Sequence, residues 1–220
     1  MLTWIERGPN NVGGRTRAFA VDVAGAVAAD IGASTGGFTD CLLQRGAARV
    51  YAVDVGRGQL DVKLRTDARV VVMEGVNARY LEALPEPVDL ATVDVAFISL
   101  RQVLPAVRRL LVSDTKARLK PGLQGKEECG GRIVALFKPQ FEAARDEVSR
   151  GGVVRDPQMH ARLIGRFAAW CVKNGLRIRG LIASPLLGPA GNREFFFDLR
   201  PVRQAQGRPI RRDQGREASP

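Results

Sequence analysis

The sequence predicts an α/β protein built on a mostly parallel sheet of seven strands, of which the last runs antiparallel. Short apolar segments rich in Val, Ile and Ala recur along the chain, and helical patterns separate them. The pattern closes with a helix and then two strands joined by a loop, which favours an antiparallel final strand. The chain has 220 residues, enough for one such domain with a buried core and few for two.

Apolar patterning places each element in turn. Seven segments are expected to be strands because each is a short apolar run: Val27–Ile31, Val50–Val53, Val70–Met73, Val88–Val93, Ile133–Phe137, Leu176–Ala183 and Glu194–Leu199. Three helices are expected between them, over Phe38–Arg45, Leu100–Leu111 and His160–Asn174. Gly46 closes the first helix, and the second carries Arg108 and Arg109 on its outer side.

Composition divides the chain into three parts. Residues 1–20 form a polar N-terminal segment, residues 21–200 carry the strand and helix patterns, and residues 201–220 contain few apolar residues. We therefore expect one domain over 21–200 and a disordered basic tail over 201–220. Residues 113–130 are polar and rich in glycine, and we interpret them as an inserted loop between a helix and a strand.

The charge balance favours an anionic partner. The chain holds 34 basic and 23 acidic residues, a net charge of +11. The tail from Arg200 to Pro220 has six arginines and two acids, so it contributes +4 and the rest of the chain +7. This excess suits phosphate backbones, although basicity alone also fits anionic lipids or mere solubility.

Membrane and export functions find no support in the sequence. No apolar stretch approaches the roughly 20 residues that a spanning helix needs, and the N-terminus lacks an apolar signal core. Cys41, Cys129 and Cys171 lie far apart and form no CxxC pair, so we expect reduced thiols in a cytoplasmic protein and no metal site.

A glycine-rich loop between the first strand and first helix marks a ligand site. The segment Asp30–Phe38 reads DIGASTGGF, in which glycines allow a sharp turn and a close approach of the backbone to a ligand. Asp54 ends the second strand, 22 residues after Gly32, where a carboxylate can bind a ribose diol. These features indicate a nucleoside-containing cofactor, and both NAD and S-adenosylmethionine fit them. A tight turn without ligand is the structural alternative.

The spacing of the loop favours S-adenosylmethionine. A dinucleotide loop reads GxGxxG and meets a pyrophosphate, whereas this loop reads GASTGG. Asp30 stands two residues before the first glycine, and its carboxylate suits the ammonium and sulfonium charges of S-adenosylmethionine better than a pyrophosphate. We therefore predict S-adenosylmethionine as the cofactor.

Six motifs together carry a family resemblance. They are Asp30–Asp40, Ala52–Gly56, Val93–Ser99, Lys138–Glu142, Gly151–Pro157 and Gly191–Phe195. Over residues 6–200 the chain resembles the TlyA (hemolysin A) family, relatives of the FtsJ-type ribose 2′-O-methyltransferases of ribosomal RNA. The resemblance implies a Rossmann-like S-adenosylmethionine-dependent methyltransferase fold, with ribosomal RNA or a ribosomal subunit as partner. The family's N-terminal S4-type RNA-binding domain is expected to be absent.

The resemblance also implies site residues. The family uses a Lys-Asp-Lys-Glu tetrad, and Asp94, Lys138 and Glu194 match its last three members. Asn11 stands near the place of the first lysine, so either Arg15 or Arg17 substitutes or that role is lost. The implied cofactor-binding residues are Asp30, Gly32, Ala33, Ser34, Thr35, Gly36, Gly37, Phe38, Asp54, Val55, Asn77 and Asp94. The implied RNA-binding residues are Arg7, Arg15, Arg17 and Arg193.

Lys138 is the candidate general base. A ribose 2′-hydroxyl must lose a proton as it attacks a methyl group, and lysine, with an ordinary pKa of about 10.4, accepts one near neutrality only if its pKa is lowered. Asp94 and Glu194 would orient the ammonium group but also oppose that lowering. A solvated ion-pair set is the alternative for these three residues.

Two further residues are expected to be structural. His160 has no second histidine or suitable cysteine with which to bind a metal, and Trp170 shares an apolar helix face with Phe167 and Leu163, a core position. Two other functions stay open beside the methyltransferase: a catalytically degenerate RNA-binding protein on the same fold, motivated by Asn11, and a membrane-active hemolysin, for which no amphipathic membrane helix is visible.

Overall fold

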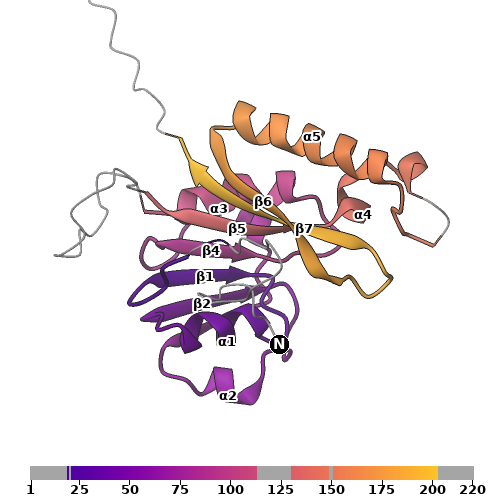
Figure 1. The fold of residues 1–220 in the computed structure, drawn as a ribbon. Coiled ribbons are helices and arrows are strands. Elements are labelled where there is room, and N and C mark those ends of the chain that lie inside the picture. Colours follow the sequence, from indigo (N-terminus) through magenta and orange to yellow (C-terminus); the bar gives the residue numbers. More distant parts are fainter. Residues whose placement is uncertain (1–18, 20, 113–129, 149–150, 203–220) are drawn as a thin grey trace, which may run out of the picture.

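A single sheet of seven strands organises the chain (Figure 1). The computed structural model describes residue 19 and residues 21–112, 130–148 and 151–202. The strands are β1 (Val27–Ile31), β2 (Arg49–Asp54), β3 (Val70–Glu74), β4 (Leu90–Val93), β5 (Arg132–Phe137), β6 (Leu176–Leu187) and β7 (Arg193–Pro201). Their order is β3-β2-β1-β4-β5-β7-β6, and β7 alone runs antiparallel to both of its neighbours. The predicted fold class is confirmed.

Helices cover both faces of the sheet. They are α1 (Gly37–Gln44), α2 (Val62–Arg65), α3 (Leu100–Leu110), α4 (Pro139–Glu142) and α5 (Pro157–Lys173), with 3₁₀ turns at Ala78–Tyr80 and Arg145–Glu147. Side chains of α3 and α5 pack on one face around Phe137 and Phe167, and those of α1 and α2 pack on the other around Leu42. The two apolar clusters explain why the strands read as continuous apolar runs.

The direction of β7 decides which residues meet at the edge of the sheet where β1, β2, β4 and β5 end. We call this edge, which carries the candidate site described below, the active edge. β1, β2, β4 and β5 are parallel, so their carboxyl ends lie at one edge. β7 is antiparallel to β5, with Phe195 opposite Phe137, so β7 begins where β5 ends. Side chains that follow β1, β2, β4 and β5 therefore gather with those that precede β7.

Caps and local pairing set the bounds that differ from the prediction. α5 begins at Pro157 and not at His160, because the Asp156 side chain accepts the Gln158 N–H and proline suits the first helical position. β4 begins at Leu90 and not at Val88, because Val88 pairs with Leu111. The helices α2 and α4 were not predicted, since four residues are too few to show a helical period.

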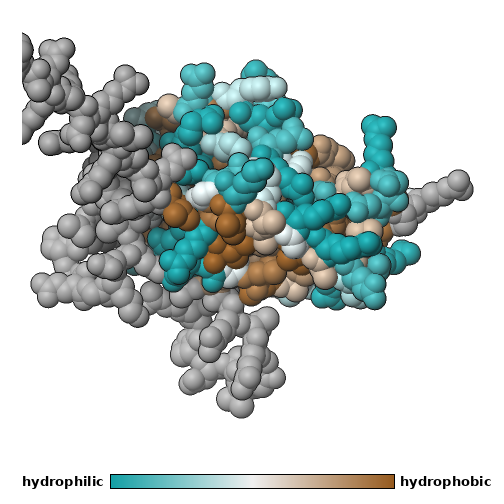
Figure 2. Space-filling model, turned by 90° about the horizontal axis from the view of Figure 1, so that it is seen from above, coloured by the Kyte–Doolittle hydropathy of each residue, from teal (hydrophilic) through white to brown (hydrophobic). Residues whose placement is uncertain are grey.

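Much of the predicted domain division lies outside the described residues. This applies to nearly all of the segment 1–20, to 113–129 of the insertion and to 203–220 of the tail. From above, Figure 2 shows a surface on which hydrophilic residues predominate and apolar side chains form small groups. Within the described ranges, no helix combines the length and apolar character that crossing a membrane requires.

Candidate active site

The glycine loop after β1 packs directly against the end of β4. Gly32 has a φ of +85°, and a Cβ at this position would stand 2.1 Å from the Asp94 carbonyl oxygen. Its N–H donates to the Val53 carbonyl oxygen at 2.8 Å, which ties the loop to β2 as well. Gly32 therefore lets the ends of three strands approach one another, and a side chain here would separate them.

Asp54 fixes the geometry at the end of β2. One carboxylate oxygen accepts the Ser34 N–H at 2.8 Å, and the other accepts the Gly56 N–H at 2.7 Å. Ser34 adopts a left-handed φ of +48°, so the loop turns sharply where it meets this carboxylate. The carboxylate is thereby held by backbone donors while its remaining lone pairs are available to a ligand.

A cavity of about 480 Å³ lies at the carboxyl edge beside these residues. Six residues that the sequence marked as cofactor-binding line it: Gly32, Ser34, Asp54, Val55, Asn77 and Asp94. The rest of its wall was not predicted and comprises Val53, Gln59, Val76, Ala78, Val95, Ala96, Phe97, Ile98 and Val103. Apolar walls with a few carboxylate and amide groups suit a nucleoside with a charged tail.

Five other predicted cofactor residues lie in or next to the glycine loop but do not line the cavity. Ala33, Thr35, Gly36, Gly37 and Phe38 are not part of the cavity wall, and Phe38 packs edge-on against Phe196 in the core. A Cβ on Gly36 would stand 2.1 Å from the Leu64 side chain, so this glycine permits close packing of α2. Direct contact of these five residues with a cofactor stays a prediction.

Asp30 is buried beneath the loop. Its carboxylate is fully inaccessible and accepts hydrogen bonds from Thr39 Oγ1 at 2.8 Å and Thr92 Oγ1 at 2.9 Å. Burial raises its pKa to about 6, and the two hydroxyl donors limit the rise. These hydrogen bonds link Asp30 in β1 to β4 and α1. The predicted contact of Asp30 with the cofactor stays a prediction.

The structure brings two members of the predicted catalytic set into contact. Lys138 Nζ lies 2.7 Å from Asp94 Oδ1, and the two side chains are 16% and 31% exposed. Lys138 follows β5 and precedes α4, while Asp94 follows β4, so the pair joins adjacent strands. Both side chains are therefore partly exposed at the carboxyl edge of the sheet.

Glu194 occupies a less accessible position at the start of β7. Its side chain accepts a hydrogen bond from Gln140 Nε2 at 3.2 Å, and the residue is 6% exposed. Burial raises the pKa of Glu194, while the Gln140 hydrogen bond and the Lys138 charge act in the opposite direction. Gln140, which the sequence analysis did not single out, thus links the segment that follows Lys138 to the start of β7.

Glu142 is a second residue that the sequence analysis did not single out. Its carboxylate accepts the Ser99 Oγ–H and the Leu100 N–H, each at 2.6 Å, and Arg101 Nε lies 3.6 Å away. Burial raises the pKa of Glu142. This carboxylate joins the segment after Lys138 to the start of α3, and so it holds together the two segments that carry Asp94 and Lys138.

An exposed aromatic side chain, Phe97, lines the same cavity as Asp94. Phe97 is 92% exposed and has a left-handed φ of +62°, an uncommon conformation for a bulky residue. Its ring centroid lies 5.3 Å from that of Phe141, whose centroid is 6.0 Å from Lys138 Nζ. The sequence motif Val93–Ser99 contained Phe97, but nothing in the apolar pattern indicated its exposure.

Asn192 connects two of the sequence motifs. Its Oδ1 accepts the Val154 N–H at 2.9 Å, and its Nδ2 donates to the Gly152 carbonyl at 3.0 Å. His160 Nε2 lies 2.8 Å from the Val154 carbonyl oxygen, which agrees with the structural role expected for it. The segment Gly151–Val154 is thereby fixed against the loop that leads into Glu194.

The remaining predicted residues fall in two groups. Arg193 is exposed at the start of β7, whereas Arg7, Asn11, Arg15 and Arg17 lie outside the described residues. In the described ranges, no cluster of His, Cys, Asp or Glu could hold a metal ion. Cys41 and Cys171 are buried there, and burial raises the pKa of Cys171 to about 12, which disfavours its reactive thiolate form.

Comparison with known proteins adds to this geometry. The sequence model of the FtsJ-like methyltransferase family matches residues 15–200. The chain is 47% identical over 199 residues to the 16S/23S rRNA (cytidine-2′-O)-methyltransferase TlyA of Mycobacterium tuberculosis, an alignment that covers 90% of this chain and 68% of that protein. It is 44% identical to the Bacillus subtilis protein named "Putative rRNA methyltransferase YqxC", covering 90% and 66%.

A solved structure shares the fold. The structure described as "Putative hemolysin from Streptococcus thermophilus" superposes with a TM-score of 0.73 at 42% identity, covering 83% of this chain and 61% of that one. The chain thus spans about two thirds of the length of the relatives it matches.

Proposed function

The chain belongs to the FtsJ-like methyltransferase family, and we propose that it methylates a ribose 2′-hydroxyl of ribosomal RNA with S-adenosylmethionine as methyl donor. One observation carries the proposal: the Lys138–Asp94 pair, 2.7 Å apart, stands at the cavity that Asp54 and the glycine loop line. The two rRNA methyltransferases named above support the substrate class. Ribosomal RNA as partner also implies a cytoplasmic location.

The cavity residues fit S-adenosylmethionine. Asp54 presents carboxylate lone pairs for a ribose diol, and Asn77 and Asp94 add polar groups beside the apolar wall of Val55, Val76 and Ile98. Gly32 lets the loop pack against the Asp94 carbonyl, which brings the Asp94 side chain to the wall of the same cavity. When bound, S-adenosylmethionine supplies a methyl group on a sulfonium, already activated for transfer to a nucleophile.

The chain's own residues would handle the proton of the ribose hydroxyl. Lys138 is placed to accept it, provided that its amine is neutral when the hydroxyl arrives. Asp94 favours the charged ammonium, so its contribution is to orient Lys138, and Glu194 with Gln140 limits the movement of the same segment. Alignment of the hydroxyl with the methyl group then contributes as much as basicity.

Phe97 and Phe141 extend the site toward the RNA. We expect the target nucleotide to be unpaired, because the bases of single-stranded RNA splay out and stack on exposed aromatic side chains. The Phe97 ring, 92% exposed and backed by Phe141, provides such a surface beside Lys138. The left-handed φ of Phe97 supports a role in binding, because strained backbone concentrates at functional sites.

Single-turnover methylation tests the proposal. The protein is mixed with labelled S-adenosylmethionine and either naked ribosomal RNA or isolated ribosomal subunits, and 2′-O-methyl sites are mapped. Transfer to one ribose position is the expected result. Methylation of a base would contradict the proposal, and so would the absence of methyl transfer to every RNA and subunit supplied.

The degenerate RNA-binding protein is the second candidate, because Asn11 stands where the family resemblance implies a lysine. The Asn11→Lys variant separates the two functions. If the wild type and this variant both bind ribosomal RNA and neither transfers a methyl group, the binding-only function is favoured. If either protein transfers a methyl group, the enzyme function is supported.

A further inference from the structure

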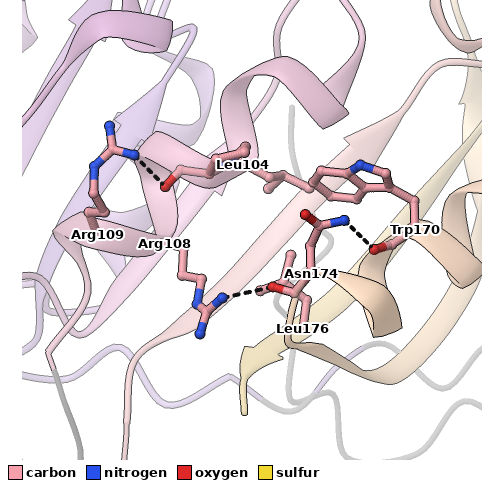
Figure 3. A pocket seen from close by; sticks show the side chains of 7 residues that line it. Leu104, Arg108, Arg109, Trp170, Asn174 and Leu176 are labelled. Atoms are coloured by element: carbon pink, nitrogen blue, oxygen red, sulfur yellow. Dashed lines mark hydrogen bonds between the residues drawn. The ribbon is translucent and has the colours of Figure 1, made fainter. Parts of the chain in front are cut away.

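A second cavity, of about 360 Å³, lies at the opposite edge of the sheet (Figure 3). It is formed by the C-terminal halves of α3 and α5 and the start of β6, and its walls are Leu104, Pro105, Arg108, Arg109, Trp170, Asn174 and Leu176. Both helices begin near the active edge and end here. None of the seven residues lines the cofactor cavity, so the two cavities are separate.

Trp170 forms a flat wall of this cavity. Its indole ring stacks on Phe167 with an interplanar angle of 14°. Trp170 therefore packs against the core, as expected, but part of its surface stays exposed. The Asn174 Nδ2 group donates to the Trp170 carbonyl at 2.8 Å. Among the described residues, neither the indole N–H nor the Asn174 Oδ1 has a hydrogen-bond partner, which leaves one donor and one acceptor for a ligand.

Two arginines bring positive charge to the same cavity. Arg108 reaches from α3 to α5, where its guanidinium donates to the Asn174 carbonyl at 2.7 Å, and Arg109 donates to the Pro105 carbonyl at 3.2 Å (Figure 3). Carbonyl acceptors do not neutralise a guanidinium. Across the described ranges neither arginine forms an ion pair, and the same holds for the exposed Lys173 and Arg177 nearby.

Helix capping explains only part of this arrangement. Arg108 and Arg109 lie in the last turn of α3, where cations stabilise the helix dipole. That role requires neither a cavity nor an indole wall with an unused donor. Val202 donates to the Gly175 carbonyl at 2.8 Å beside this cavity, and the sequence that follows holds five arginines and two acids. Cationic residues therefore continue along the chain from this point.

We propose that this cavity binds one nucleotide of single-stranded RNA, with the base against Trp170 and the adjoining phosphates on Arg108 and Arg109. An indole stacks on any base, and guanidinium groups bind phosphate oxygens. The inference rests on the proposed function, because the RNA would be part of the same substrate. The edges of the sheet are separated by strands of four to six residues, roughly 13–20 Å, which an RNA chain spans in a few nucleotides.

Tryptophan fluorescence provides the test. The Trp4→Phe variant leaves Trp170 as the single tryptophan, and the probe is a nine-nucleotide single-stranded RNA of mixed sequence. Saturable quenching of Trp170 by this RNA is expected. Trp170→Leu should weaken RNA binding about 5- to 150-fold, the equivalent of losing one base–aromatic stack. Arg109→Gln should lower the slope of log affinity against log salt by about 0.7.

Matched controls separate this site from general electrostatics. Lys63→Gln removes one charge from α2, on the other face of the sheet, and should leave Trp170 quenching unchanged. Arg109 is exposed, so Arg109→Gln keeps the test valid if Trp170→Leu fails to fold. Absence of quenching, an unchanged salt slope in Arg109→Gln, or equal quenching by a polyglutamate peptide overturns the proposal.

The readout is independent of methyl transfer. If the Trp4→Phe protein methylates ribosomal RNA while Trp170 is not quenched, this inference alone is contradicted. If neither the wild type nor the Trp4→Phe protein methylates any RNA but Trp170 is saturably quenched in Trp4→Phe, the proposed function alone is contradicted and the nucleotide site is supported.

Discussion

The proposed site has two halves, which differ in the contacts that hold them. We name the part beside β1 and β2, proposed to bind the cofactor, the cofactor half, and the part beside β5 and β7, proposed to carry out catalysis, the catalytic half. Beside β1 and β2, Asp54 is fixed by two backbone N–H groups, and Glu74 accepts the Gly58 N–H at 2.9 Å. Beside β5 and β7, side chains hold side chains, as in the Lys138–Asp94 pair and the Gln140–Glu194 hydrogen bond. The position of Asp54 therefore depends on the backbone around it, whereas the Lys138–Asp94 and Gln140–Glu194 contacts depend on the identity of each side chain.

Lys138→Ala should show the largest effect, because it removes a side chain from the catalytic half. General-base catalysis usually accounts for about 10²–10⁴-fold in rate, and loss of the Asp94 contact adds misalignment. We expect methyl transfer to fall by at least that factor while S-adenosylmethionine binding stays nearly intact. Single-turnover assays and calorimetry measure the two quantities. Lys63→Ala is the control, and activity that survives in Lys138→Ala removes the lysine from the mechanism.

Gly32→Ala should be the most damaging glycine change in the cofactor half. The new Cβ would meet the Asp94 carbonyl at 2.1 Å in a left-handed backbone, so we expect unfolding free energy to fall by about 3 kcal/mol or more. Gly58→Ala is the matched control, because its φ is +69° but no atom lies within 4 Å of a Cβ. That variant should lose about 1–2 kcal/mol. Equal losses in urea denaturation would refute the close-approach argument.

Asp30→Asn probes the exception in the cofactor half, where hydroxyl groups hold a carboxylate. The folded pKa of about 6 exceeds the ordinary 3.8, so the native state binds a proton more tightly than the unfolded chain. Stability of the wild type should therefore fall as pH rises from about 4 to 6, by on the order of 3 kcal/mol relative to Asp30→Asn. Urea denaturation across this range measures it, and parallel curves for the two proteins would contradict burial of a charged Asp30.

Asp54→Ala should affect ligand binding more than folding. Loss of one charged hydrogen-bond partner weakens binding by about 1.5–3 kcal/mol, or roughly one to two decades in S-adenosylmethionine affinity. Asp61→Ala is the control, because Asp61 also accepts a backbone N–H, from Lys63 at 2.8 Å, but lies outside the cavity wall. Calorimetry that finds tight NAD binding and no S-adenosylmethionine binding would overturn the cofactor assignment.

The same contrast explains what the sequence could predict. The bounds of β1 were predicted without error because five buried residues form an uninterrupted run, and Asp54 was placed by its distance from the glycine loop. The Ser99–Glu142 contact joins residues 43 positions apart, which no local pattern reveals. The exposure of Phe97 depends on a left-handed turn between β4 and α3, and its apolar side chain alone would have predicted burial.

Two connections of the sheet differ in how closely they lie to the candidate site, and so in how freely their length can change. The connection between α3 and β5 passes Val112 and Gly131, where the Gly131 N–H donates to the Val112 carbonyl at 3.2 Å. That closed base lies at the edge remote from Lys138, so residues can be gained or lost between these two points without moving the catalytic set. The turn between β6 and β7 leads directly into Glu194 and has no such freedom. We therefore expect insertions between Val112 and Gly131 to disturb the candidate site less than insertions in the turn before Glu194.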